Sequence, residues 1–130
     1  TDVLVIDNEP AILDGMQHLL AGWGCSVHVA RGSKDAVMAY DSAQGRIDMI
    51  LADFHLDKED GISLISKLRR RARRHIPAIL ITADRSLAVA DLALAHDVHV
   101  LRKPVKPAAL RAAMSHAVMF QVAIKAGVGE

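Results

Sequence analysis

Short hydrophobic runs alternate with longer segments of helical periodicity along the whole chain. The runs contain almost no polar alternation, which is typical of strands buried on both faces of a parallel sheet. They predict five strands, at Val3–Ile6, Cys25–Ala30, Ile47–Ala52, Ala78–Ile81 and Val98–Leu101.

Hydrophobic residues recur every three or four positions after each of these runs, which predicts five helices. The first begins at Pro10 and stops by Gly22 to Gly24, and the second runs from Ser33, whose hydroxyl we expect to cap it, to about Ala43. Alternation of this kind implies a single α/β domain, with a parallel sheet and helices on both faces. The positions that define the other three helices are Ile62, Ile65 and Leu68, then Leu87–Ala95, then Leu110, Met114, Ala117 and Val118.

Composition narrows the class of protein. The 130 residues suit one compact domain, and the balance of 16 basic against 15 acidic side chains does not favour a nucleic-acid partner. The single cysteine, Cys25, excludes an internal disulfide and favours a reducing, cytoplasmic location. We see no signal peptide and no hydrophobic run of the roughly 18 residues that span a membrane. A start at Thr1 is expected of a segment from a longer protein.

Polar side chains stand where four of the predicted strands end. Asp7 and Asn8 follow the first strand, Asp53 the third and Thr82 the fourth, and Lys103 comes two positions after the end of the fifth. Ligands of open parallel sheets bind beyond the carboxyl ends of the strands. We therefore expect these groups to converge on one site.

This set of groups suits phosphoryl transfer to a carboxylate. A carboxylate can attack phosphorus and form an acyl phosphate, and the reaction mainly requires neutralisation of charge on the phosphoryl oxygens. Asp7 and Asp53 provide ligands for Mg²⁺, Lys103 provides a point charge, and Thr82 provides a hydrogen-bond donor.

The segments VLVIDNEP, MILADFHLDKEDG, AILITAD and VLRKP resemble those of CheY-like receiver domains of the response-regulator superfamily. The resemblance covers about residues 2–120. It implies a flavodoxin-like, doubly wound five-stranded sheet in the order 2-1-3-4-5, a receiver domain over residues 2–122, and a C-terminal tail over 123–130.

The resemblance also implies a role for each group at the strand ends. Asp53 would be the phosphoacceptor, supplied by a phosphohistidine of a histidine kinase or phosphotransfer domain. It further implies Asp7, Asp53 and the backbone carbonyl of His55 as Mg²⁺ ligands, Thr82 as switch hydroxyl, and Lys103 as phosphate-sensing cation, with a cis peptide bond before Pro104. We add Asn8 to the expected Mg²⁺ ligands, because an amide oxygen can still bind the ion.

Two positions depart from the family pattern near the site. The family usually has an acid at the position of Asn8, so we expect weaker Mg²⁺ binding; an alternative role for Asn8 is to cap the first helix. The family often has an aromatic residue at the position of Val100. The usual coupling between the threonine and an aromatic ring is therefore not expected here, and output takes another route or the domain relays phosphoryl groups.

Charged clusters flank the predicted third helix. Asp57 stands where the family often has proline, and we expect Asp57, Glu59 and Asp60 to be solvated turn residues, with Asp60–Gly61 starting the helix. A place for Asp57 or Glu59 near the metal is the alternative. The five arginines between positions 69 and 74 predict a solvated helix end.

The sequence is compatible with several functional alternatives. A non-phosphorylated pseudo-receiver that acts as an interaction module is the main one; a haloacid-dehalogenase-like phosphatase and a flavodoxin fit the motifs poorly. The domain itself would have autophosphatase activity at most.

Segments such as LRKPVKPAALR resemble the C-terminal receivers of hybrid sensor histidine kinases. We therefore favour a hybrid histidine kinase as the parent protein. Excess hydrophobic residues late in helix five suggest a homodimer through that helix, at Met119, Phe120, Val122 and Ile124.

Overall fold

Five parallel strands form one sheet in the order β2-β1-β3-β4-β5, which confirms the predicted topology. The computed structural model describes residues 1–125, and their side chains as far as residue 118. Each strand lies within two residues of its predicted range. The three central strands are almost fully buried, as expected of continuous hydrophobic runs, whereas the two edge strands are partly exposed. The strands are β1 Asp2–Ile6, β2 Ser26–Ala30, β3 Met49–Asp53, β4 Ala78–Thr82 and β5 His99–Arg102.

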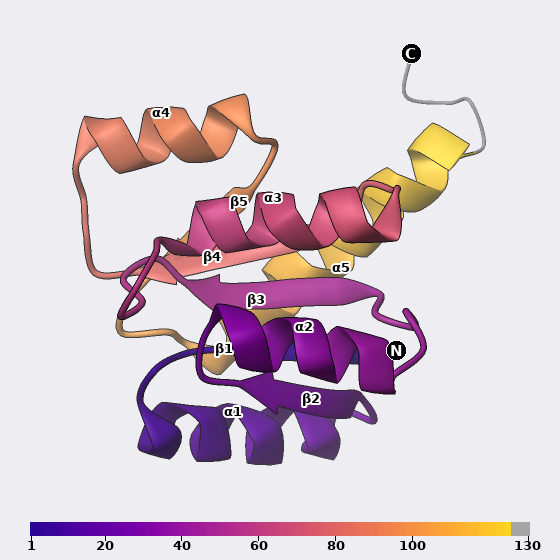
Figure 1. The fold of residues 1–130 in the computed structure, drawn as a ribbon. Helices are drawn as coiled ribbons and strands as arrows, with labels where there is room; N and C mark the ends of the chain where they lie inside the picture. The colour runs from indigo at the N-terminus through magenta and orange to yellow at the C-terminus, as the bar shows by residue number, and fades with distance from the viewer. Residues whose placement is uncertain (126–130) are drawn as a thin grey trace.

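Helices cover both faces of the sheet in a three-layer arrangement. Figure 1 shows α2 and α3 in front of the sheet and α5 behind it. Helices α1 and α5 pack on one face, and α2, α3 and α4 on the other. The helices are α1 Pro10–Gly22, α2 Ser33–Ser42, α3 Gly61–Ala72, α4 Leu87–Ala95 and α5 Pro107–Lys125. Among these helices, as far as the structure describes them, none is long and hydrophobic enough to span a membrane.

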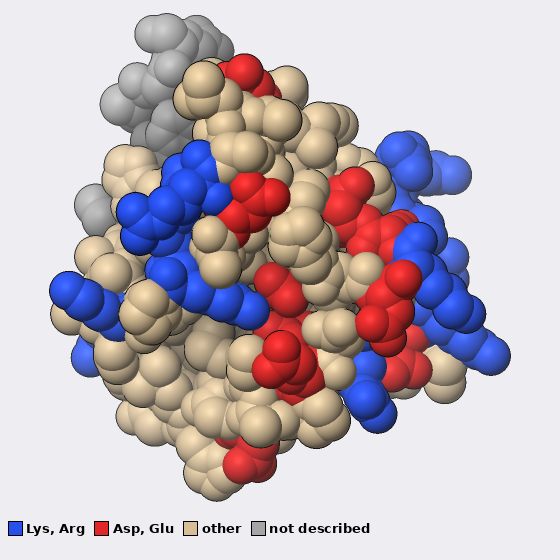
Figure 2. Space-filling view, turned by 90° about the vertical axis from the view of Figure 1, so that its left-hand side faces the viewer, with Lys and Arg blue, Asp and Glu red and all other residues tan. Residues whose placement is uncertain are grey.

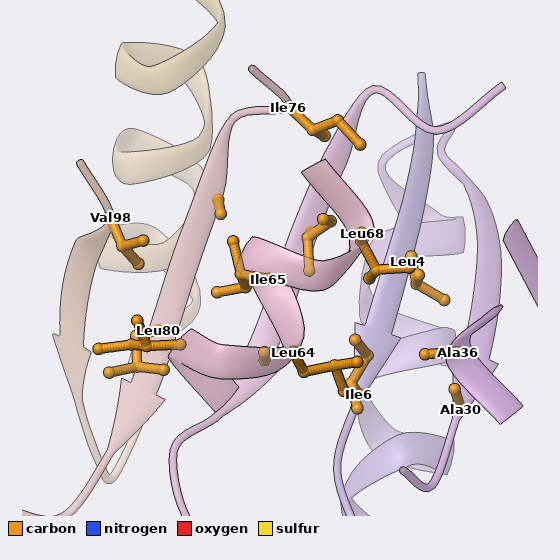
Figure 3. Packing of buried hydrophobic residues seen from close by; sticks show 14 of the residues in the cluster. Leu4, Ile6, Ala30, Ala36, Leu64, Ile65, Leu68, Ile76, Leu80 and Val98 are labelled. Carbon is orange, nitrogen blue, oxygen red and sulfur yellow. The ribbon is translucent and has the colours of Figure 1, made fainter. Parts of the chain in front are cut away.

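The larger hydrophobic core lies between the sheet and α3. Leu64, Ile65 and Leu68 are fully buried and face the strand residues Leu4 and Leu80 (Figure 3). Alternate residues of the same strands face the second core, under α1 and α5. The central strands are therefore held on both sides, which makes their carboxyl ends a rigid support for a site.

Two predicted helix caps are wrong. Gly32 occupies the N-cap position of α2, and Ser33 is the first helical residue; its hydroxyl instead accepts a hydrogen bond from Lys67 Nζ at 2.7 Å. Asn8 does not cap α1, whose N-cap is Glu9. Both polar side chains are used in tertiary contacts, which compete with local capping.

The arginine run at the end of α3 is not simply a solvated helix end. Arg69 is partly buried, and its guanidinium donates to the carbonyl oxygens of Ile76, His96 and Asp97 at 2.6 to 3.1 Å. It thereby ties the end of α3 to the end of α4 and to the start of β4. The prediction of a homodimer through helix five falls on side chains beyond residue 118, outside the described ones.

Candidate functional site

Asp53 and Asp7 form a buried acidic pair at the carboxyl edge of the sheet. Asp53 ends β3 and is 8% exposed, and Asp7 follows β1 and is 4% exposed. Lys103 Nζ lies 3.4 Å from Asp53 Oδ1 and 3.7 Å from Asp7 Oδ2. Three of the five groups that we expected to converge therefore do so here, because β1, β3 and β5 are parallel and end at the same edge.

The charges of this cluster do not balance. Burial raises the pKa of Asp53 above its usual value, and the neighbouring Asp7 carboxylate raises it further, while the Lys103 ammonium partly opposes both. The carboxylates of Asp7 and Asp53 share the single ammonium group of Lys103, and both carboxylates are buried. The cluster therefore favours an added cation.

This electrostatic strain predicts that Asp53→Asn stabilises the metal-free protein at neutral pH, by about 1 kcal/mol. The pKa of Asp53 is higher in the folded than in the unfolded chain, so its ionisation opposes folding. That cost is absent below the unfolded pKa, grows as the pH rises towards the folded pKa, and is complete above it. Thermal unfolding of both proteins between pH 3 and 8, with chelator present, measures the effect. A constant difference across this range would contradict it.

Thr82 ends β4 directly beside this cluster. It is fully buried, its backbone carbonyl accepts from Lys103 N at 2.9 Å, and its register partner is Arg102. The Thr82 hydroxyl oxygen accepts a hydrogen bond from Asp84 N at 3.0 Å. The hydroxyl proton remains available to a further acceptor, such as a phosphoryl oxygen.

The loop between β3 and α3 is packed tightly against Asp53. Gly61 N donates to the Phe54 carbonyl at 2.8 Å, and a Cβ atom at Gly61 would lie 2.2 Å from the backbone oxygen of Asp53. Asp60 starts α3 as predicted, because its carboxylate accepts a hydrogen bond from Ser63 N. A glycine after this cap is therefore required for β3 and α3 to approach each other so closely.

Two side-chain contacts at the mouth of the site were not predicted. Asn8 Nδ2 donates to Asp57 Oδ1 at 2.9 Å, and His55 Nε2 lies 3.5 Å from Asp84 Oδ2. Each contact joins two different strand-to-helix loops. Only the acidic and polar character of these loops was visible in the sequence, because the partners are distant along the chain.

A hydrophobic cavity of about 530 Å³ opens beside the acidic pair. Its walls include Ile12 and Met16 of α1 and Val105 of the loop before α5, and Asp53 and Lys103 also line it. Figure 2 shows acidic side chains gathered over the middle of this face, with basic side chains on both sides of them. Asp53 therefore lines a cavity on a face of the molecule that carries charges of both signs.

The chemistry of these groups fits Mg²⁺. Asp7 and Asp53 offer carboxylate oxygens, and Asn8 offers an amide oxygen, all hard ligands of the kind that Mg²⁺ prefers. The backbone of His55 pairs with Asp60 in an isolated bridge, so its carbonyl belongs to an ordered loop at the same edge. Among the side chains that the structure describes, no three or more His, Cys, Asp or Glu lie together in a metal-binding arrangement. The ligands named here include only two such acids, Asp7 and Asp53, together with an amide oxygen and a backbone oxygen.

The peptide bond between Lys103 and Pro104 is cis, as the family resemblance implied. The position of Val100, where the family often has an aromatic ring, is partly buried against the core on the α3 face.

Comparison with known proteins identifies related sequences and folds. The family model for the response regulator receiver domain matches residues 3–115. The transcriptional regulatory protein ZraR of Escherichia coli O157:H7 is 30% identical over 94 residues, which cover 72% of this chain and 20% of ZraR. The regulator PhyR of Methylorubrum extorquens is 32% identical over 125 residues, 93% of this chain and 45% of PhyR. The chain thus spans less than half the length of these relatives.

Solved structures agree with this assignment. A response regulator receiver domain protein from Clostridium thermocellum superimposes with a TM-score of 0.85 at 26% identity, over 95% of this chain and 98% of that one. The chemotaxis protein CheY4 of Vibrio cholerae has a TM-score of 0.82 at 22% identity, over 90% of this chain and 98% of that one, and so supports the fold.

Proposed function

Because the chain belongs to the response regulator receiver domain family, we propose that Asp53 accepts a phosphoryl group from a phosphohistidine of a histidine kinase or phosphotransfer domain. The observation that carries this proposal is the convergence of Lys103 with Asp53 and Asp7 at one edge of the sheet. We place the functional unit at residues 2–122 and leave 123–130, of which 123–125 continue α5, outside it.

The proposed transfer is a displacement at phosphorus. A bond forms between an Asp53 carboxylate oxygen and phosphorus as the bond between phosphorus and the donor's imidazole nitrogen breaks. The imidazole ring, protonated at its other nitrogen, leaves as neutral imidazole with the electron pair of that bond, and no proton needs to move from Asp53, which attacks as the carboxylate. Lys103 is near enough to Asp53 to pair with the phosphoryl oxygens of the product.

Charge neutralisation is the main requirement of this reaction. The residues that would hold Mg²⁺ are Asp7, Asn8, Asp53 and the backbone carbonyl of His55, and the bound ion would supply positive charge to the phosphoryl oxygens. Thr82 would donate its hydroxyl proton to another phosphoryl oxygen. Its hydrogen bond from Asp84 N links this event to the loop that leads into α4.

For the parent protein we propose a hybrid histidine kinase. The proposal is supported by the segment LRKPVKPAALR and by Val100 in place of an aromatic switch residue, whereas the named relatives ZraR and PhyR are regulators. Sequencing the gene outward from the codon of Thr1 decides between a hybrid kinase and a regulator as the parent protein. A kinase core upstream supports the hybrid protein, and an output domain downstream without a kinase core overturns it.

Phosphorylation is tested by incubation with acetyl phosphate or phosphoramidate and Mg²⁺, followed by intact mass measurement. We expect one phosphoryl adduct on the wild-type protein, its complete loss in Asp53→Asn, and its retention in Asp91→Asn, which changes an exposed carboxylate on α4. Absence of an adduct on the wild-type protein with both donors would favour a pseudo-receiver, and an adduct that survives Asp53→Asn would place the acceptor elsewhere.

A further inference from the structure

Two of the three departures from the family pattern near the site, Asn8 and Asp57, are in contact with each other. Asn8 replaces the usual acid after β1, and Asp57 replaces the frequent proline after β3. Although 49 positions separate them, Asn8 Nδ2 donates to Asp57 Oδ1 at 2.9 Å. The chain therefore lacks a carboxylate at position 8 but has one at Asp57, which accepts a hydrogen bond from the Asn8 amide.

This contact orients the Asn8 amide. Its NH₂ group is directed to Asp57, so its Oδ1 points away from Asp57 within the amide plane. Among the residues whose side chains the structure describes, no donor meets this oxygen. Since Oδ1 is the side-chain atom with which asparagine binds a hard cation, an amide fixed in this way is prepared for metal binding.

The other acids of the same loop have different partners. Glu59 Oε1 lies 3.5 Å from Lys67 Nζ, and Asp60 caps α3 through Ser63 N. Among these three loop acids, Asp57 is the one directed to the β1 side of the site. Its exposure keeps its charge hydrated, so it adds negative potential without the burial cost that Asp7 and Asp53 incur.

We infer that Asp57 is a positioning residue for Mg²⁺ binding: its hydrogen bond holds the Asn8 amide with Oδ1 available as a ligand. Partners of this kind typically change metal affinity by about 10- to 100-fold. The inference rests on the proposed function, because it assumes that Mg²⁺ binds beside Asp53.

Calorimetric titration of the folded protein with MgCl₂, without any phosphodonor, tests the inference. We expect Asp57→Ala to weaken Mg²⁺ binding by about tenfold, at the low end of the range because Asp57 is exposed. Asp57→Asn retains an oxygen acceptor for the Asn8 amide and is expected to lose much less. Glu59→Gln, which changes the neighbouring acid that contacts Lys67, is the matched control and should bind as the wild type does.

A double-mutant cycle with Asn8→Asp distinguishes orientation of the Asn8 amide from a general effect of the Asp57 charge. This variant restores the usual acid and no longer needs an oriented amide, so Asp57→Ala should have little effect in its background. Wild-type affinity in Asp57→Ala, or an equal loss in both backgrounds, would overturn the inference. Failure of the proposed function has a different signature: Mg²⁺ titrations of the wild type and of Asp53→Asn would be the same.

Discussion

Replacing Lys103 with methionine is expected to slow the phosphorylation of Asp53 by about 100-fold, the usual cost of removing one preorganised charge from a transition state. Lys103 Nζ is close to both buried carboxylates, at 3.4 Å from Asp53 and 3.7 Å from Asp7. Methionine preserves the length and hydrophobic contacts of the side chain but removes the charge. The rate of adduct formation from acetyl phosphate, followed by intact mass at saturating Mg²⁺, measures the effect.

The same substitution should alter the pH dependence of the reaction. The Lys103 charge lowers the pKa of Asp53, so its removal raises that pKa further. Because Asp53 attacks as the carboxylate, the rate falls as the pH drops through this pKa. The fall should therefore begin at a higher pH in Lys103→Met than in the wild type.

Lys106→Met provides the control, because Lys106 lies three residues further along, is exposed, and has no ion pair among the described side chains. It should phosphorylate at the wild-type rate with an unchanged pH profile. If Lys103→Met and Lys106→Met reacted equally fast, Lys103 would have no part in the transfer.

The main elements of the site were predictable because they depend on strand direction alone. Hydrophobic runs identified the strands, and parallel strands necessarily end at one edge, so Asp7, Asp53 and Lys103 could be brought together without any long-range information. The order of the strands came from the family resemblance and was confirmed. The limits of α1, α2 and α4 followed within one or two residues from hydrophobic spacing and from Pro10 and Gly22, whereas α5 begins three residues before Leu110, the first position predicted for it.

Contacts between distant polar side chains could not be predicted. A hydroxyl such as that of Ser33 has equally plausible local and tertiary partners, and here Lys67 on α3 takes precedence over the cap. The carbonyl groups that bind Arg69 become available only where α3, α4 and β4 end near one another. The contact between Asn8 and Asp57 likewise depends on how two loops are placed by the completed sheet.

A second large effect is expected from Gly61→Ala, which should destabilise the domain by about 3 kcal/mol. The added methyl group would lie 2.2 Å from the Asp53 backbone oxygen and 3.0 Å from Leu80 Cδ1. The nearer contact is with backbone in the middle of a five-stranded sheet, so relief requires α3 or the end of β3 to move. Such a shift displaces Asp53 from Lys103, and phosphorylation should slow together with the loss of stability.

Denaturant unfolding and the rate of adduct formation measure these two consequences, and Gly15→Ala is the matched control. Gly15 lies within α1, and a Cβ atom there would meet no heavy atom within 4 Å. Alanine favours a helix interior over glycine by about 0.5–1 kcal/mol, so this variant should be slightly more stable than the wild type and equally reactive. The opposite signs of the two glycine replacements follow from one difference, the proximity of Gly61 to the strand that carries Asp53. Equal stability of the two variants would show that α3 and β3 are not held together as closely as this geometry requires.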